Sequence, residues 1–272
     1  MDLTEQSAVE LAAGIRAKSL TAVGIMEAFL DRIDRVNGQV NAIISLRDRS
    51  ALLDEARQAD RVEPTGPLHG LPLAVKDLAA TKGLRTTWGS PLFADFVPGK
   101  DDLIVDRMRS AGAIFIGKTN TPEWGHGSHS FNPVHGVTRN PYDLGKSAGG
   151  SSGGAAAALA ARMLPVADGS DMMGSLRNPA AFCNIYGFRP TWGLVPADAE
   201  GDTFLHTMAT EGPMGRTVGD IALLLGVLAG PNPQVPFGRP NEDFLGQLET
   251  SVRGKRIGWL GETMHRAVKV LA

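Results

Sequence analysis

The chain has 272 residues, of which 43% are hydrophobic and 21% are charged, and its formal net charge at pH 7 is -2. These proportions are typical of a globular protein and argue against intrinsic disorder, a coiled coil or a basic surface for nucleic acid. The longest apolar run, 221–230, is about half a membrane span. The single cysteine excludes an internal disulfide framework and an all-cysteine zinc site. The N-terminal sequence lacks the basic start and apolar core of a signal peptide, so we expect a cytoplasmic protein with no membrane partner.

Helical patterns dominate the first sixty residues. Ser7 and Glu10 have the spacing of a capping box at a helix N-terminus. Over 21–36, apolar residues recur at helical spacing and charged residues fill the positions between them. A third helix is expected over about 49–61. The sequence therefore predicts a helical N-terminal region over about 5–62.

The rest of the chain alternates between short apolar runs and helical patterns, which argues for α/β layers. Between 119 and 154 the periodicity disappears and a loop is expected; Pro179 is placed at the start of a further helical turn. The proline-rich stretch 231–240 is interpreted as a surface loop, with a linker as the alternative. The expected strands cover 71–75, 113–116, 164–167 and 255–260, and the expected helices cover 102–111, 153–162 and 217–229.

Three motif matches are discounted. Residues 112–119 fit the phosphate-loop pattern, but the intervening residues form a strand and no helix follows. Residues 145–149 and 150–154 both fit the nucleophile-elbow pattern, but no buried strand precedes them. Three loop histidines lack the spacing of zinc ligands and are expected to hydrogen-bond the backbone, namely His126, His129 and His135.

Two serine-containing glycine loops and one lysine carry the remaining chemistry. The loop at 148–154 leads directly into a small-residue helix, and the loop at 168–179 places Ser175 after a strand, where backbone N–H groups could converge on a developing oxyanion. Lys76 ends an apolar strand, with Asp77 on the opposite side. Burial would lower the pKa of Lys76 and make it a base, unless its side chain reaches the surface. The residues alone therefore suggest a lysine-assisted serine hydrolase.

The segment 149–191 resembles the signature sequence of the amidase signature family. It reads G-G-S-S-G-G-A-A-A-A-L-A-A-R-M-L-P-V-A-D-G-S-D-M-M-G-S-L-R-N-P-A-A-F-C-N-I-Y-G-F-R-P-T. Upstream, G-L-P-L-A-V-K-D resembles the family's lysine motif, and G-K-T-N-T-P-E-W and E-G-P-M-G-R-T-V-G-D resemble further segments. The resemblance implies an α/β fold, an α/β/α sandwich around a mixed β-sheet. It implies one domain over 1–272, incomplete at the C-terminus because the family's chains are considerably longer.

The resemblance also implies a catalytic triad. Ser175 would be the nucleophile, Ser151 the bridging serine that follows a cis Gly150–Ser151 peptide bond, and Lys76 a buried base hydrogen-bonded to Ser151. The backbone N–H groups of the oxyanion hole would belong to Met172, Met173 and Gly174, and the supporting residues would be Ser152, Asp171 and Arg177. Met172 and Met173 depart from the family's pattern, which usually has Thr and Gly at these positions. Neither a metal nor a cofactor is implied.

The implied reaction is hydrolysis of a small-molecule carboxylic amide to acid plus amine through a serine acyl-enzyme. One alternative is the A subunit of a tRNA-dependent amidotransferase, which would usually show D-T-G-G-S-I-R-Q-P; Asn178 and the two methionines argue against it. Another alternative is a truncated, non-catalytic remnant, since the last residues do not align with the family. No nucleic-acid partner is expected, and a homodimer is left open.

Overall fold

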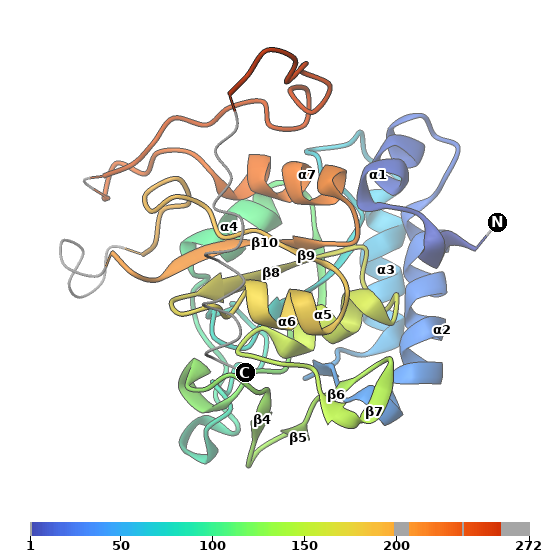
Figure 1. The fold of residues 1–272 in the computed structure, drawn as a ribbon. Coiled ribbons are helices and arrows are strands. Elements are labelled where there is room, and N and C mark those ends of the chain that lie inside the picture. Colours follow the sequence, from blue (N-terminus) through green and yellow to red (C-terminus); the bar gives the residue numbers. More distant parts are fainter. Residues whose placement is uncertain (1, 199–206, 236, 257–272) are drawn as a thin grey trace.

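Helices form one side of the molecule at the N-terminal end of the chain. The computed structural model describes residues 2–198, 207–235 and 237–256. The capping box between Ser7 and Glu10 is formed, and α2 is terminated by Asn41, the residue after its last helical position, which adopts a left-handed conformation. Helices α2 (Ala22–Val40) and α3 (Arg49–Ala59) lie side by side on the right in Figure 1, and α1 (Ala8–Arg16) lies above them.

Two three-stranded sheets meet at the centre of the fold. The first has the order β1-β3-β2, with β2 parallel and β1 antiparallel to β3; the second has the order β8-β10-β9 and is antiparallel. Strand β2 lies against β8, where the Asp168 carboxylate accepts the backbone N–H of Lys76 at 3.1 Å. The strands are β1 (Ile43–Ile44), β2 (Pro72–Lys76), β3 (Ile114–Thr119), β8 (Val166–Asp171), β9 (Tyr186–Gly187) and β10 (Thr210–Gly215).

Helices cover both faces of these sheets, as expected for α/β/α layers (Figure 1). Helices α4 (Leu103–Ser110) and α7 (Val218–Leu228) lie on one face, and α5 (Gly153–Ala160) and α6 (Arg177–Phe182) lie on the other. Each face has its own hydrophobic cluster: α5 packs with parts of α2 and α3, and α1 packs with α4 and α7. In the described ranges, no helix has the length and apolar character that a bilayer crossing requires.

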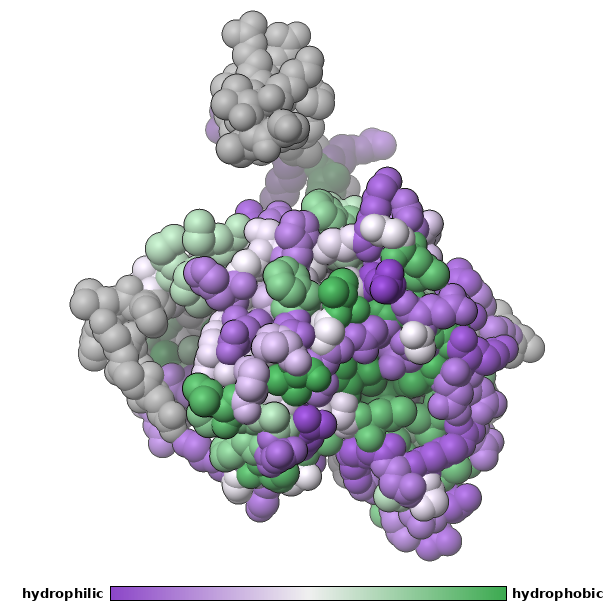
Figure 2. Space-filling model, turned by 90° about the horizontal axis from the view of Figure 1, so that it is seen from below, coloured by the Kyte–Doolittle hydropathy of each residue, from purple (hydrophilic) through white to green (hydrophobic). Residues whose placement is uncertain are grey.

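The segment expected to be loop contains two small hairpins. Asn132 closes one turn by accepting the N–H groups of Val134 and His135, and Asn140 closes the other by accepting that of Tyr142. Three of the four strands have only two residues, too few for a periodic pattern, and the five-residue strand is mostly polar and exposed, so it shows no apolar run. The four strands are β4 (Phe131–Asn132), β5 (Gly136–Val137), β6 (Arg139–Asn140) and β7 (Asp143–Ser147), and the lower face that carries them shows apolar side chains among polar ones (Figure 2).

Two strands extend beyond their expected ends because pairing with a neighbouring strand sets them, and one helix begins earlier than expected. Strand β8 continues to Asp171 through polar residues, since each of its residues pairs with β10. Strand β3 extends to Thr119, where it pairs with the end of β2. Helix α6 begins at Arg177, two residues before Pro179. From residue 257 onward, the strand expected at 255–260 lies outside the described residues.

A buried carboxylate joins two helix N-termini. Asp220 forms a capping box with Thr217 at the start of α7 and also accepts the N–H of Ala8 at 2.7 Å at the start of α1. A negative charge is favourable at a helix N-terminus, where N–H groups lack intrahelical acceptors. Asp220 therefore fixes the packing of α1 on α7.

Substituting Asp220→Ala should lower the free energy of unfolding by about 2–4 kcal/mol, because buried N–H groups of two helices lose their acceptor. Urea denaturation followed by circular dichroism measures the change. The control is Asp54→Ala, which removes an exposed carboxylate paired with Arg57 and should change stability by less than about 1 kcal/mol. Equal effects of the two substitutions would contradict this role for Asp220.

Candidate active site

The ammonium group of Lys76 lies inside the protein at the end of β2. Its side chain is 1% exposed, and Nζ donates hydrogen bonds to three serine hydroxyls: Ser151 Oγ at 2.8 Å, Ser152 Oγ at 2.9 Å and Ser170 Oγ at 2.8 Å. Lys76 makes no ion pair with any carboxylate in the described ranges. A buried lysine surrounded by neutral hydroxyls is an unusual arrangement, since buried ammonium groups normally have an anionic partner.

Burial therefore dominates the protonation of this lysine. It lowers the pKa of Lys76 to about 8, against the attraction of Glu211, Asp168 and Asp171. A pKa near 8 leaves a useful fraction of free amine at neutral pH, which an ordinary lysine does not have. The side chain can therefore act as a proton acceptor toward the hydroxyls that it contacts.

The next residue, Asp77, faces away from this group. Its carboxylate accepts the N–H of Thr87 at 3.1 Å and the Thr87 hydroxyl at 2.5 Å. A second buried lysine, Lys118, attracts the Asp77 carboxylate electrostatically. The ammonium group of Lys118 donates a hydrogen bond to Thr81 Oγ1 at 2.9 Å. Burial also lowers the pKa of Lys118 to about 8. Asp77 is thus engaged on the other side of the strand, as alternation predicts.

The first glycine loop presents Ser151 and Ser152 at the start of α5. The Gly150–Ser151 peptide bond is cis, as the resemblance implies. Ser130 Oγ donates to the Ser151 carbonyl at 3.1 Å and accepts the N–H of Gly153 at 2.9 Å. A Cβ on Gly154 would lie 2.2 Å from the backbone nitrogen of Asn120. The small residues of α5 therefore allow it to pack directly on the chain that follows β3.

Asp171 holds the second loop in shape. Its carboxylate accepts N–H groups from Gly174 at 2.7 Å and Leu176 at 3.1 Å, and it receives two hydrogen bonds from the Arg177 guanidinium. Arg189 forms a further ion pair with it at 3.4 Å. Burial opposes the ionised form, but these donors outweigh it and lower the pKa of Asp171. The loop before Ser175 therefore folds around a fixed negative charge.

Ser175 follows this turn and is half-buried. Its carbonyl accepts the N–H of Ser152 at 3.2 Å, which joins the two glycine loops. Among the described residues, no hydrogen bond links the hydroxyl of Ser175 to that of Ser151. The structure therefore brings Lys76, Ser151 and Ser152 into contact and places Ser175 beside them through the backbone.

The expected oxyanion donors differ in availability. The N–H of Gly174 is already donated to Asp171, whereas within the described chain the N–H groups of Met172, Met173 and Ser175 have no acceptor. Gly174 has a φ of 121°, and a Cβ there would lie 2.6 Å from the Asn178 side chain, so glycine is required. The free donors of this loop are thus those of the two methionines and of the serine itself.

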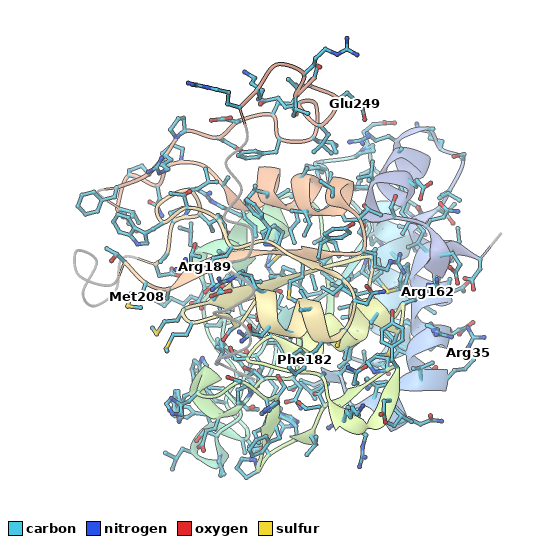
Figure 3. All side chains as sticks on the ribbon, viewed as in Figure 1. Arg35, Arg162, Phe182, Arg189, Met208 and Glu249 are labelled. Atoms are coloured by element: carbon cyan, nitrogen blue, oxygen red, sulfur yellow. The ribbon has the colours of Figure 1, made fainter. Side chains whose placement is uncertain are left out.

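Sequence reasoning missed four residues that shape the site, namely Asp168, Ser170, Arg189 and Glu211. Ser170 contacts Lys76 directly, and Asp168 holds the Lys76 backbone. Period-two spacing places Asp168 and Ser170 on one face of β8, which was a usable signal once that stretch is recognised as a strand. Arg189 lies at the ends of β8 and β10, where its guanidinium donates to the Met208 carbonyl at 2.6 Å (Figure 3).

Two of the loop histidines contact hydroxyl groups rather than the backbone. His129 Nδ1 lies 2.9 Å from Ser147 Oγ, and His135 Nε2 lies 3.2 Å from Thr87 Oγ1. In the described part of the chain, no group of three or more His, Cys, Asp or Glu residues is arranged to hold a metal ion.

Comparison with known proteins shows the family of this chain. A family model described as Amidase matches residues 24–269. The chain belongs to the amidase signature family. An acylamidase of Rhodococcus erythropolis is 42% identical over 267 residues, covering 94% of this chain and 56% of that protein. The A subunit of the glutamyl-tRNA(Gln) amidotransferase from Alkaliphilus metalliredigens is 40% identical over 264 residues, covering 95% of this chain and 54% of that protein.

Solved structures of amidase signature enzymes share the fold. A bacterial aryl acylamidase superposes with a TM-score of 0.84 and 35% identity, over 92% of this chain and 53% of that one. The peptide amidase of Stenotrophomonas maltophilia superposes with a TM-score of 0.79 and 34% identity, over 89% of this chain and 53% of that one. The chain thus spans about half the length of the amidase signature proteins that it matches.

The burial of Lys76 predicts a distinctive pH dependence of stability. With a folded pKa of about 8 and an unfolded pKa of about 10.4, the charged lysine costs the folded state about 3 kcal/mol. The cost is fully present below pH 8. It fades as the pH rises toward 10.4, because the folded protein then releases a proton that the unfolded chain still binds.

Between pH 7 and pH 10, the stability of the unmodified chain relative to Lys76→Met should therefore rise by about 2–3 kcal/mol. Urea denaturation of both proteins across this range measures the difference, in which the titration of all other lysines cancels. A difference that stays constant with pH would mean that Lys76 titrates like an exposed lysine.

Proposed function

We propose that this chain carries the catalytic machinery of an amide hydrolase, with Ser175 as nucleophile, Ser151 as proton bridge and Lys76 as base. The observation that carries the proposal is the 2.8 Å hydrogen bond from Lys76 Nζ to Ser151 Oγ inside the protein. Among the residues that the structure describes, no ion pair holds this lysine as a cation. A serine hydroxyl is a weak nucleophile unless a base takes its proton. Lys76 can supply that base through Ser151.

In the proposed reaction, Ser175 Oγ attacks the amide carbonyl carbon as its proton passes to Ser151 Oγ, and the Ser151 proton passes to Lys76 Nζ. The attack includes a rotation of the Ser175 side chain toward Ser151. The N–H groups of Met172, Met173 and Ser175 stabilise the oxyanion. Lys76 then returns the proton through Ser151 to the leaving nitrogen, and the C–N bond breaks. Water attacks the acyl-Ser175 ester by the same proton path and releases the acid.

The proposed substrate is a small amide with an apolar acyl or aryl group. Met172 and Met173 flank the nucleophile loop and are 47% and 81% exposed, so their side chains are available to line an apolar pocket beside Ser175. Methionine adapts its shape to irregular apolar ligands. The names of the relatives, acylamidase and aryl acylamidase, support the same substrate class.

An amidotransferase subunit is the second candidate, because several such subunits are 38–41% identical to this chain. The methionine pair and Asn178 depart from the D-T-G-G-S-I-R-Q-P sequence usual for that subunit, which favours the amidase. The homodimer left open by the sequence and the absence of a nucleic-acid partner stay predictions.

Three serine substitutions test the proposed roles. Ser175→Ala should abolish hydrolysis of an aryl acylamide, measured by release of the arylamine. Ser151→Ala should lower kcat by about 100-fold or more with little change in KM, because the proton bridge acts chiefly in the transition state. Ser152→Ala, which removes a different hydroxyl contact of Lys76, should leave measurable turnover.

Circular dichroism of each variant separates loss of chemistry from loss of fold. Full activity of Ser175→Ala would overturn the assignment of the nucleophile. Equal losses in Ser151→Ala and Ser152→Ala would remove the special role of Ser151.

A further inference from the structure

A carboxylate on β10 faces the catalytic lysine across β8. In the antiparallel pairing of these strands, Glu211 is directly opposite Ser170. Paired residues in an antiparallel sheet point to the same face, with Cβ atoms about 5 Å apart. Ser170 Oγ in turn lies 2.8 Å from Lys76 Nζ. Glu211 therefore lies next to Ser170, the serine that Lys76 contacts from β2.

The surroundings of Glu211 are mostly acidic. The titratable groups that act on its carboxylate are Lys76 on β2, Asp168 on β8, Asp102 at the start of α4, and Asp198. Burial and the three aspartates raise the pKa of Glu211, and Lys76 alone among these groups lowers it. Glu211 is half-buried, and within the described chain its carboxylate accepts no hydrogen bond.

The other two carboxylates near Lys76 are already engaged. Asp171 is held by Arg177, Arg189 and backbone N–H groups of its own loop. Asp168 accepts the backbone N–H of Lys76 and also lies near the buried Lys118. Of the carboxylates that attract the Lys76 ammonium, Glu211 has the largest effect.

We propose that Glu211 is a positioning residue that controls the proton on Lys76, acting across Ser170. When Glu211 is ionised, it attracts the Lys76 ammonium toward Ser170 and stabilises the charged lysine. When Glu211 is protonated or replaced by a neutral residue, the buried ammonium loses this support, and the free amine that can accept a proton from Ser151 is favoured. The two groups titrate as a coupled pair.

The proposal's relevance to catalysis rests on the proposed function, but its test does not require activity. Lysines labelled with 13C at Cε are titrated by NMR, and the Lys76 signal is assigned by its absence in Lys76→Met. In Glu211→Gln, the titration midpoint of Lys76 should fall by about half a pH unit or more. In the control Glu249→Gln, whose exposed side chain lies at the top of Figure 3, the midpoint should not move.

A reciprocal measurement does not depend on the folding of Glu211→Gln. With glutamate labelled at the side-chain carboxyl carbon, the Glu211 signal in Lys76→Met should titrate at higher pH than in the unmodified chain, because it has lost its cation. An unchanged Lys76 midpoint in Glu211→Gln, or an unchanged Glu211 midpoint in Lys76→Met, would overturn the proposal. A shift of both midpoints in a chain that hydrolyses no amide would support the coupling and contradict only the proposed function.

Discussion

The site depends on an ammonium group that is removed from water and given hydroxyl partners instead of a bound carboxylate. Ser151, Ser152 and Ser170 each accept a hydrogen bond from Lys76, so hydroxyl groups solvate the cation, and no carboxylate of the described segments forms an ion pair with it. A carboxylate in direct contact would hold the lysine as a cation and deprive the serines of a base. A hydroxyl can accept a hydrogen bond from the charged form and donate one to the free amine, so the same geometry serves both protonation states.

The rest of the fold holds three chain segments together around the Lys76 ammonium group. Strand β2 brings the lysine, the loop before α5 brings two serines, and β8 brings the third. Close packing of α5 on Asn120 explains why that helix consists of small residues, since a Cβ on Gly154 would overlap the neighbouring backbone. Asp171 holds the second loop in place, because its carboxylate binds backbone N–H groups and two guanidinium groups.

Local sequence patterns predicted those features of the structure that residues close together in the sequence determine. The capping residues Ser7 and Glu10 and the apolar periodicity of α2 marked their helices, and alternation placed Asp77 away from Lys76. Ser170 was missed because the polar stretch after residue 167 was not recognised as a continuation of strand β8. Glu211 was missed because its place beside Ser170 depends on the register between β8 and β10, which no local pattern records. The residues alone placed Ser175 where backbone N–H groups could converge on an oxyanion, but its role as nucleophile came from the resemblance to the amidase signature family. The two-residue strands were missed because they have no period.

The central claim is that Lys76 is a depressed-pKa base that activates Ser175 through Ser151. Its most direct test is the rate at which a fluorophosphonate reacts covalently with the chain at different pH values, with mass spectrometry locating the adduct. The account predicts an adduct on Ser175 whose rate of formation rises with a midpoint near the Lys76 pKa of about 8 and falls by about 100-fold or more in Lys76→Met. An adduct on another serine, or the same rate and pH profile in Lys76→Met, would contradict it.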